Sequence, residues 1–193
     1  MSQDFWNEYY KNNSSPWTTP DAGFVTEVTR LPTGSALELG CGEGADSIWL
    51  AKRNWEVTAV DFAPAAIENL TLAAKKQGLN IKGVVADVST YQSDKKYDMV
   101  FMCYIHLLRD QRNQTLVCAT EALAPCGTLV YIGIAQSSTP SDIPVELLAT
   151  SDEIVAVLSD LIIEREDVSH RVIEMPDENF TADVITIRAK RPL

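Results

Sequence analysis

Residues 36–51 have the sequence ALELGCGEGADSIWLA. The apolar start of this stretch is typical of a buried β-strand, and its end has the pattern of a helix. Between the two lie three alternating glycines, Gly40, Gly42 and Gly44. Glycines at such a junction permit a tight turn and let a ligand come close to the backbone. The stretch therefore predicts a βα unit with a ligand-binding turn.

The same alternation of strand and helix continues along most of the chain. The expected strands are residues 36–40, 55–60, 81–86, 97–103 and 128–134, and the expected helices are residues 44–53, 64–77 and the segment that ends at the turn 125–127. Strands that are joined by helical crossovers form a parallel sheet with helices on both of its faces.

The C-terminal part of the chain has a different pattern. Residues 150–153 (TSDE) form a capping box for a short helix, and residues 160–174 and 182–190 are β-prone. The connector at 175–179 is too short for a helical crossover, so these two strands are expected to form an antiparallel hairpin. The sequence thus predicts a Rossmann-like, doubly wound α/β fold: a mostly parallel, seven-stranded sheet with an antiparallel C-terminal strand.

The length and charge of the chain limit its organisation and its partners. At 193 residues one domain is expected, with residues 1–30 as a helical cover or lid over the edge of the sheet and residues 31–193 as the core. The 27 acidic residues outnumber the 16 basic ones, which gives a net charge of −11. Nucleic acids and anionic membranes are therefore disfavoured as partners. Oligomeric state is not predicted.

Cysteine usage and hydropathy indicate the compartment. The four cysteines are scattered and form no CxxC pair, so neither a metal site nor a disulfide framework is expected. No apolar run reaches the ~18 residues of a membrane span, and the N-terminus lacks the features of a secretory signal. The chain is expected in the cytoplasm.

Acidic residues around the glycine turn indicate the kind of ligand. Asp61 ends the second strand, where its carboxylate can accept hydrogen bonds from both hydroxyls of a ribose. Glu38 precedes the turn and Glu43 lies within it. Two carboxylates would repel the pyrophosphate of a dinucleotide but attract an amine and a sulfonium, and the G-x-G-x-G spacing also differs from the dinucleotide motif. These residues favour S-adenosylmethionine.

The sequence resembles the class I S-adenosylmethionine-dependent methyltransferases. The similar stretches are ALELGCGEGADSIWLA (36–51), WEVTAVDFAP (55–64), VVADVST (84–90) and YDMVFMCYIHLL (97–108). The N-terminal FWNEYYKNNSSPW (5–17) resembles a narrower branch, the small bacterial enzymes related to tellurite-resistance and thiopurine methyltransferases.

This resemblance implies a set of cofactor-binding residues. They are Gly40, Cys41, Gly42 and Gly44 in the turn, Glu38 at the amino-acid end of the cofactor, Asp61 at the ribose, Phe62, Asp87 and Val88 at the adenine, and Cys103 at the methionine portion. Residues 103–106 (CYIH) depart from the Asn, Asp or Pro-containing motif that the family often has there.

The acceptor side of the site is less defined by the sequence. His106 could be a general base or a substrate contact, or it could have a structural role. Tyr10 and Trp17 could form an aromatic lid over the substrate, or they could anchor the N-terminal segment by burial. Cys103 is not expected to act as a nucleophile, because direct methyl transfer needs no enzyme-bound intermediate.

The predicted function is methyl transfer from S-adenosylmethionine to a small-molecule acceptor by direct in-line displacement, with S-adenosylhomocysteine as the product. Little chain remains beyond the core to recognise a macromolecule. One alternative is a nicotinamide-dependent oxidoreductase, and another is a non-catalytic protein that binds S-adenosylmethionine. The sequence does not define the acceptor or the atom that is methylated.

Overall fold

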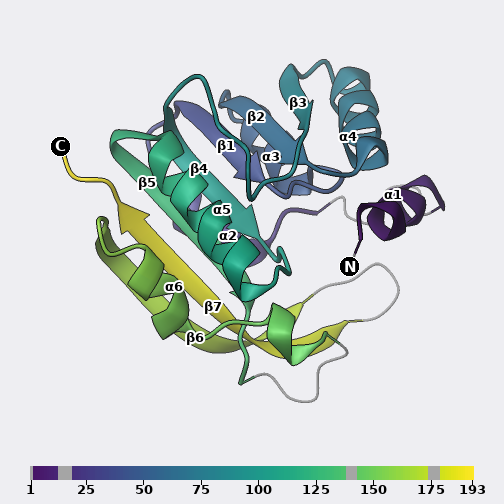
Figure 1. The fold of residues 1–193 in the computed structure, drawn as a ribbon. Helices are drawn as coiled ribbons and strands as arrows, with labels where there is room; N and C mark the ends of the chain where they lie inside the picture. Colours follow the sequence, from purple (N-terminus) through teal and green to yellow (C-terminus); the bar gives the residue numbers. More distant parts are fainter. Residues whose placement is uncertain (1, 13–18, 138–142, 174–178) are drawn as a thin grey trace.

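A computed structural model describes residues 2–12, 19–137, 143–173 and 179–193 (Figure 1). These residues form a seven-stranded sheet with the order β3-β2-β1-β4-β5-β7-β6. The strands are β1 (Ser35–Leu39), β2 (Glu56–Asp61), β3 (Ile81–Val85), β4 (Tyr97–Cys103), β5 (Leu123–Ile134), β6 (Ile162–Ile173) and β7 (Phe180–Lys190). The first five strands are parallel, and β7 pairs antiparallel with both β5 and β6. The predicted fold class is confirmed.

Helices cover both faces of this sheet. They are α1 (Gln3–Asn12), α2 (Ala22–Val28), α3 (Ala45–Ala51), α4 (Pro64–Lys76), α5 (Arg109–Ala122) and α6 (Ser151–Val157), with a 3-10 turn, η1 (Val145–Leu147). Side chains of α5 and α6 share one core with the sheet, and those of α2 and α3 share another on the opposite face. None of the helices in the described ranges is long and apolar enough to cross a membrane.

Strand residues alternate between the two cores, because successive side chains point to opposite faces of a sheet. In β1, Ala36 points to the α2–α3 side, and Leu37 and Leu39 point to the α5–α6 side. In β4, Met99 and Phe101 belong to the first side. The order of the strands reverses between β1 and β4, so the carboxyl ends of these two strands are where a ligand is expected in an open α/β sheet.

Most of the predicted elements lie where the local signals placed them. Pro64 begins α4, and Gly78 follows its end with a left-handed φ of 67°. The capping box at Thr150 is present, with the Thr150 hydroxyl accepting from the Glu153 amide and the Glu153 side chain accepting in return. The predicted hairpin is also confirmed, whereas most of its expected connector at 175–179 lies outside the described residues.

The predicted end of the helix before β5 and the predicted start of β5 are wrong, since α5 already ends at Ala122. Strand β5 begins at Leu123 rather than at residue 128, because the turn-like residues 125–127 lie within the strand instead of ending a helix. There Cys126 has a φ of 61°, and the pairing of β4 with β5 shifts between Tyr97 and Met99. An irregularity in a strand and the end of a helix use the same turn-forming residues.

The N-terminal segment does not simply cover the edge of the sheet. Helix α2 packs against its face, with the ring of Phe24 stacked on that of Phe101 at a centroid distance of 4.4 Å. Helix α1 packs against α4, where the Ala65 amide donates to the Asn7 side chain (3.0 Å) and the Asn69 side chain donates to the Tyr10 carbonyl (3.0 Å). This arrangement brings α1 close to the carboxyl edge of the sheet (Figure 1).

A buried carboxylate fastens α2 to the C-terminal hairpin. The side chain of Glu27 is 2% exposed and forms ion pairs with Arg165 and Arg188, each at 2.9 Å. We expect Glu27→Ala to lower the free energy of unfolding by about 2 kcal/mol, because both guanidiniums lose their buried partner but keep access to water. Urea denaturation measures this loss, with the exposed Glu166→Ala as the control. Equal unfolding midpoints for the two variants would contradict the expected role.

Candidate functional site

The glycine turn connects β1 to α3 at the carboxyl edge of the sheet. Its backbone requires glycine, since Gly40, Gly42 and Gly44 have φ angles of 76°, 51° and 77°. A Cβ on Gly40 would lie 2.6 Å from the Ile105 side chain, and one on Gly42 would lie 2.9 Å from the Tyr10 hydroxyl. The turn is thus enclosed by the segment that follows β4 and by α1.

Asp61 supports this turn from the end of β2. One oxygen of its buried carboxylate accepts from the Gly42 amide, and the other accepts from the Ala63 amide, both at 2.9 Å. Burial raises the pKa of Asp61, while these hydrogen bonds oppose the shift. A carboxylate oxygen has more than one lone-pair site, so Asp61 can accept further hydrogen bonds from a ligand.

Buried acidic side chains cluster beside the turn. Glu38 is buried in β1, where the Ser47 hydroxyl donates to it, and burial together with the nearby Asp46 raises the pKa of Glu38 well above its usual value. Burial also raises the pKa of Asp46 to about 7, although this side chain accepts from the Asp21 amide at 2.9 Å. A bound cation would lower these pKa values, whereas a bound anion would raise them further. The cluster fits the cationic amino-acid portion of S-adenosylmethionine.

Two further acidic side chains lie in this cluster, and the structure adds to what the sequence indicated about them. Glu43 accepts a hydrogen bond from Asn69 of α4 at 2.8 Å, so its carboxylate is held by that helix. Asp46 was missed, although its position two residues after Gly44 in the first turn of α3 was a signal. Its neighbour Asp21 accepts from the Tyr104 hydroxyl at 2.9 Å, a contact that no local pattern could indicate.

The predicted adenine-side residues follow the ends of β2 and β3. Phe62 packs with the aromatic side chains of α1, and Val88 is buried. Asp87 is exposed, and its carboxylate accepts from the backbone amide and the hydroxyl of Ser89 at 2.9 and 2.7 Å. The Ala86 amide donates to the Asp61 carbonyl at 3.0 Å, which joins this segment to the ribose-side acid.

Thiols and the imidazole near the site are uncharged. Burial raises the pKa of Cys41 and of Cys103 well above the usual value, so both thiols stay protonated near neutral pH and are poor nucleophiles. His106 lies between β4 and α5, and burial lowers its pKa to about 4. Its Nε2 atom is buried and has no hydrogen-bond partner among the described residues.

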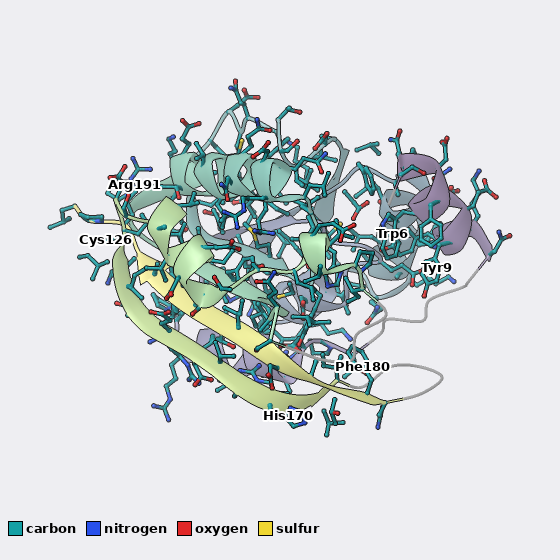
Figure 2. The ribbon with its side chains drawn as sticks, turned by 60° about the horizontal axis from the view of Figure 1, so that its bottom comes forward. Trp6, Tyr9, Cys126, His170, Phe180 and Arg191 are labelled. Atoms are coloured by element: carbon teal, nitrogen blue, oxygen red, sulfur yellow. The ribbon has the colours of Figure 1, made fainter. Side chains whose placement is uncertain are left out.

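Tyr10 lies against the turn from the side of α1. Its ring stacks on Trp6 at a centroid distance of 5.7 Å, and burial next to Asp61 raises the pKa of its hydroxyl. Figure 2 shows Trp6 and Tyr9 on the same helix, at the end of the molecule away from Cys126. Trp17, the other predicted lid residue, lies outside the described residues.

The part of the chain that contains this site is similar to known methyltransferases. Residues 36–127 match the protein family described as "Methyltransferase domain", and this match includes the turn, the acidic cluster and the end of β4. Residues 36–127 thus correspond to a methyltransferase domain, and the chain has the Rossmann-like fold of known S-adenosylmethionine-dependent methyltransferases. The predicted class and cofactor are confirmed.

Three known proteins are similar to most of this chain. Nodulation protein S from Rhizobium tropici is 24% identical over 172 residues, covering 88% of this chain and 68% of that protein. The crystal structure of TehB from Haemophilus influenzae has a TM-score of 0.80 at 19% identity, covering 98% of this chain and 66% of that one. The N-methyltransferase NodS from Bradyrhizobium japonicum WM9, in complex with S-adenosyl-L-homocysteine, has a TM-score of 0.76 at 19% identity and 100% coverage of both chains.

The curated relatives are longer than this chain. The chain spans between 52% and 68% of the length of three relatives that it matches along most of its own sequence. The activities in the names of these relatives are therefore properties of those longer proteins.

Proposed function

We propose that this chain transfers the methyl group of S-adenosylmethionine to a small-molecule acceptor by direct in-line displacement. The observation that carries this proposal is the buried acidic cluster of Glu38 and Asp46 beside a left-handed glycine turn. It supports a cationic nucleoside ligand and disfavours a dinucleotide pyrophosphate. Residues 1–193 would act as a single methyltransferase domain, with residues 31–193 as its core.

Each part of the cofactor would have its own contacts. Glu38 would bind the ammonium, Asp61 the ribose hydroxyls and Asp87 the adenine amino group, whereas Phe62 and Val88 would pack around the base. Bound S-adenosylmethionine supplies a methyl group that its sulfonium already activates. The protein then has to position the acceptor, and positioning alone can lower a barrier by up to ~7–11 kcal/mol.

The N-terminal segment would exclude water from this site. The hydrogen bonds of Asn7 and Asn69 fasten α1 to α4, and Gln3 donates to the Phe62 carbonyl at 2.5 Å. Tyr10 would therefore cover the turn from a fixed helix. An acceptor enclosed in this way loses competing water, which strengthens its polar contacts with the protein.

Calorimetric titration separates this proposal from its alternatives. S-adenosylhomocysteine is expected to bind the purified chain at micromolar concentration, and NADH is expected not to bind. Binding of NADH alone would contradict the proposal in favour of an oxidoreductase. A panel of thiol, amine and hydroxyl acceptors then tests for consumption of S-adenosylmethionine, and tight binding without turnover on any of them would favour a non-catalytic binding protein.

His106 is proposed as the base for acceptors that must lose a proton. We expect His106→Ala to lower kcat about 100-fold or more for a hydroxyl acceptor, since general base catalysis typically contributes that much. A thiolate acceptor needs no base, so its kcat should not change.

The low pKa of His106 determines the form of the pH profile. The imidazole binds a proton only below a pH of about 4, so its contribution should be complete at neutral pH and should be lost as the pH falls through 4. The kcat with saturating ligands should show no titration of this group between pH 5.5 and 8. His170→Ala is the control, because His170 lies on the outer strand of the hairpin (Figure 2) and pairs with Asp183. An unchanged kcat of His106→Ala with a hydroxyl acceptor would remove this residue from the mechanism.

A further inference from the structure

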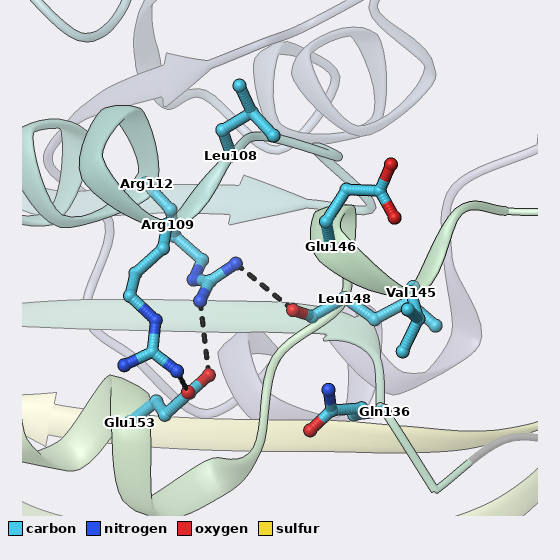
Figure 3. A pocket seen from close by; sticks show the side chains of 8 residues that line it. All are labelled: Leu108, Arg109, Arg112, Gln136, Val145, Glu146, Leu148 and Glu153. Carbon is cyan, nitrogen blue, oxygen red and sulfur yellow. Dashed lines mark hydrogen bonds and ion pairs between the residues drawn. The ribbon is translucent and has the colours of Figure 1, made fainter.

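A pocket of about 230 Å³ lies beyond the carboxyl ends of β4 and β5 (Figure 3). Leu108 and Arg109 line it from the start of α5, Gln136 from the segment after β5, Val145 and Glu146 from η1, and Glu153 from α6. We propose that this pocket binds the methyl acceptor and that the acceptor is a small molecule with an apolar body and an anionic group that pairs with Arg109. This inference rests on the proposed function.

The position of the pocket is suited to an acceptor. It opens at the same edge of the sheet as the glycine turn, and the short segment 104–108 leads from the end of β4 past His106 to the pocket wall. Ligands of open α/β sheets bind at this edge. The acidic cluster serves the cofactor at the ends of β1 and β2, which leaves the ends of β4 and β5 for a second ligand.

The walls of the pocket are partly apolar and uncovered. Leu108 is 50% exposed and Val145 is 56% exposed, although both line a concave site. Apolar side chains that stay accessible within a pocket are typical of a surface that a ligand covers. The volume is below the ~300 Å³ at which drug-sized sites begin, but an apolar cavity of about 150 Å³ already admits benzene. One ring with a small substituent fits this range.

Two guanidinium groups share one carboxylate on the opposite side of the pocket. The side chain of Arg112 is 3% exposed, and its Nη2 donates to Glu153 at 3.1 Å. Its Nη1 donates to the Leu148 carbonyl at 3.2 Å and to the Leu107 carbonyl at 3.3 Å. The other oxygen of Glu153 accepts from Arg109 (Figure 3). These three side chains together carry one net positive charge, and Glu146 on the far wall balances it over the whole lining, so the positive charge is confined to the side of Arg109 and Arg112.

Arg109 is the member of this group that can contact a ligand. Its side chain is 66% exposed, and only one of its nitrogens is engaged by Glu153, so further N–H donors remain for an anion. Arg112, in contrast, is held by three protein acceptors and fixes the segments that form the wall. Glu146 carries a negative charge on the far wall and would direct an anionic group away from itself, towards Arg109.

Three probes of nearly equal shape test the charge of the acceptor. Benzoate, benzamide and benzylamine carry charges of −1, 0 and +1 near neutral pH, and their binding to the chain saturated with S-adenosylhomocysteine can be followed by ligand-observed NMR. We expect benzoate to bind roughly tenfold or more tightly than the other two, as one charge-assisted contact provides. Arg109→Gln should remove this preference, and the matched pocket variant Glu146→Gln should retain it.

The outcomes separate this inference from the proposed function. S-adenosylhomocysteine is titrated first into all three proteins, and its failure to bind to the unmodified chain contradicts the proposed function whatever the probes do. With that ligand bound, equal affinities of the three probes, tightest binding of benzylamine, or a benzoate preference that survives Arg109→Gln would each overturn the assignment of an anionic acceptor.

Discussion

Asp61→Ala is expected to weaken the binding of S-adenosylhomocysteine about 100-fold. Without the carboxylate, the two ribose hydroxyls would each lose a charge-assisted hydrogen bond to the protein. Such bonds contribute about 1.5–3 kcal/mol each before the remaining contacts adjust. Asp61 also holds the Gly42 and Ala63 amides, so the turn itself would loosen in the variant. Calorimetric titration measures the change in the dissociation constant.

Two further variants separate the loss of ribose contacts from general damage. Asp61→Asn keeps one acceptor oxygen and should bind with intermediate affinity. Asp160→Ala removes an exposed carboxylate far along the chain from the turn and should bind like the unmodified protein. Thermal unfolding without ligand shows whether each variant is folded. A folded Asp61→Ala protein whose dissociation constant rises less than threefold would exclude this carboxylate from ribose recognition.

The parts of the fold that the sequence predicts correctly depend on local signals. The β-branched run at 55–60 predicts β2 (Glu56–Asp61) to within one residue, Pro64 starts α4, and the left-handed Gly78 follows its end. The glycine turn is also a local feature, because its backbone angles require glycine at three nearby positions. Such signals need no knowledge of which segments meet in space.

The features that the sequence does not predict depend on contacts between distant residues. Arg112 lies in the first turn of the polar helix α5, and its partners Leu148 and Glu153 are 36 and 41 residues away. Asp46 meets Asp21 across 25 residues. Glu43 accepts from Asn69 of α4, which is 26 residues away. The electrostatics of a site depend on such pairings, so a count of acidic residues near a motif gives the sign of the charge but not its position.

The glycine turn also has a contact with a distant residue that its sequence motif does not predict. The sequence predicts that all three permit a tight turn and a close approach of the ligand, and their left-handed angles agree with the tight turn. Gly44 has an additional reason, because a Cβ there would lie 2.1 Å from the Leu70 side chain, which is fully buried in α4. This glycine permits the close packing of α3 and α4, which is a contact within the protein.

Gly44→Ala is therefore expected to lower the free energy of unfolding by about 2–5 kcal/mol. The left-handed φ of 77° costs about 1–2 kcal/mol for a residue with a Cβ, and displacing the buried Leu70 adds about 1–3 kcal/mol. Urea denaturation with the slope held constant measures the change. Because α3 and α4 both support the turn, the affinity for S-adenosylhomocysteine should fall as well.

Gly78→Ala is the matched control, since it separates backbone strain from the steric clash. Gly78 has a similar φ of 67°, but a Cβ there would meet no atom within 4 Å. This variant should lose only the ~1–2 kcal/mol of backbone strain and should bind S-adenosylhomocysteine normally. A double variant, Gly44→Ala with Leu70→Ala, should lose less stability than the sum of the two single variants, because the smaller side chain makes room for the new methyl group. If Gly44→Ala and Gly78→Ala lose the same stability, the glycine is needed for its backbone angle alone, and the packing of α3 on α4 tolerates a methyl group at the turn.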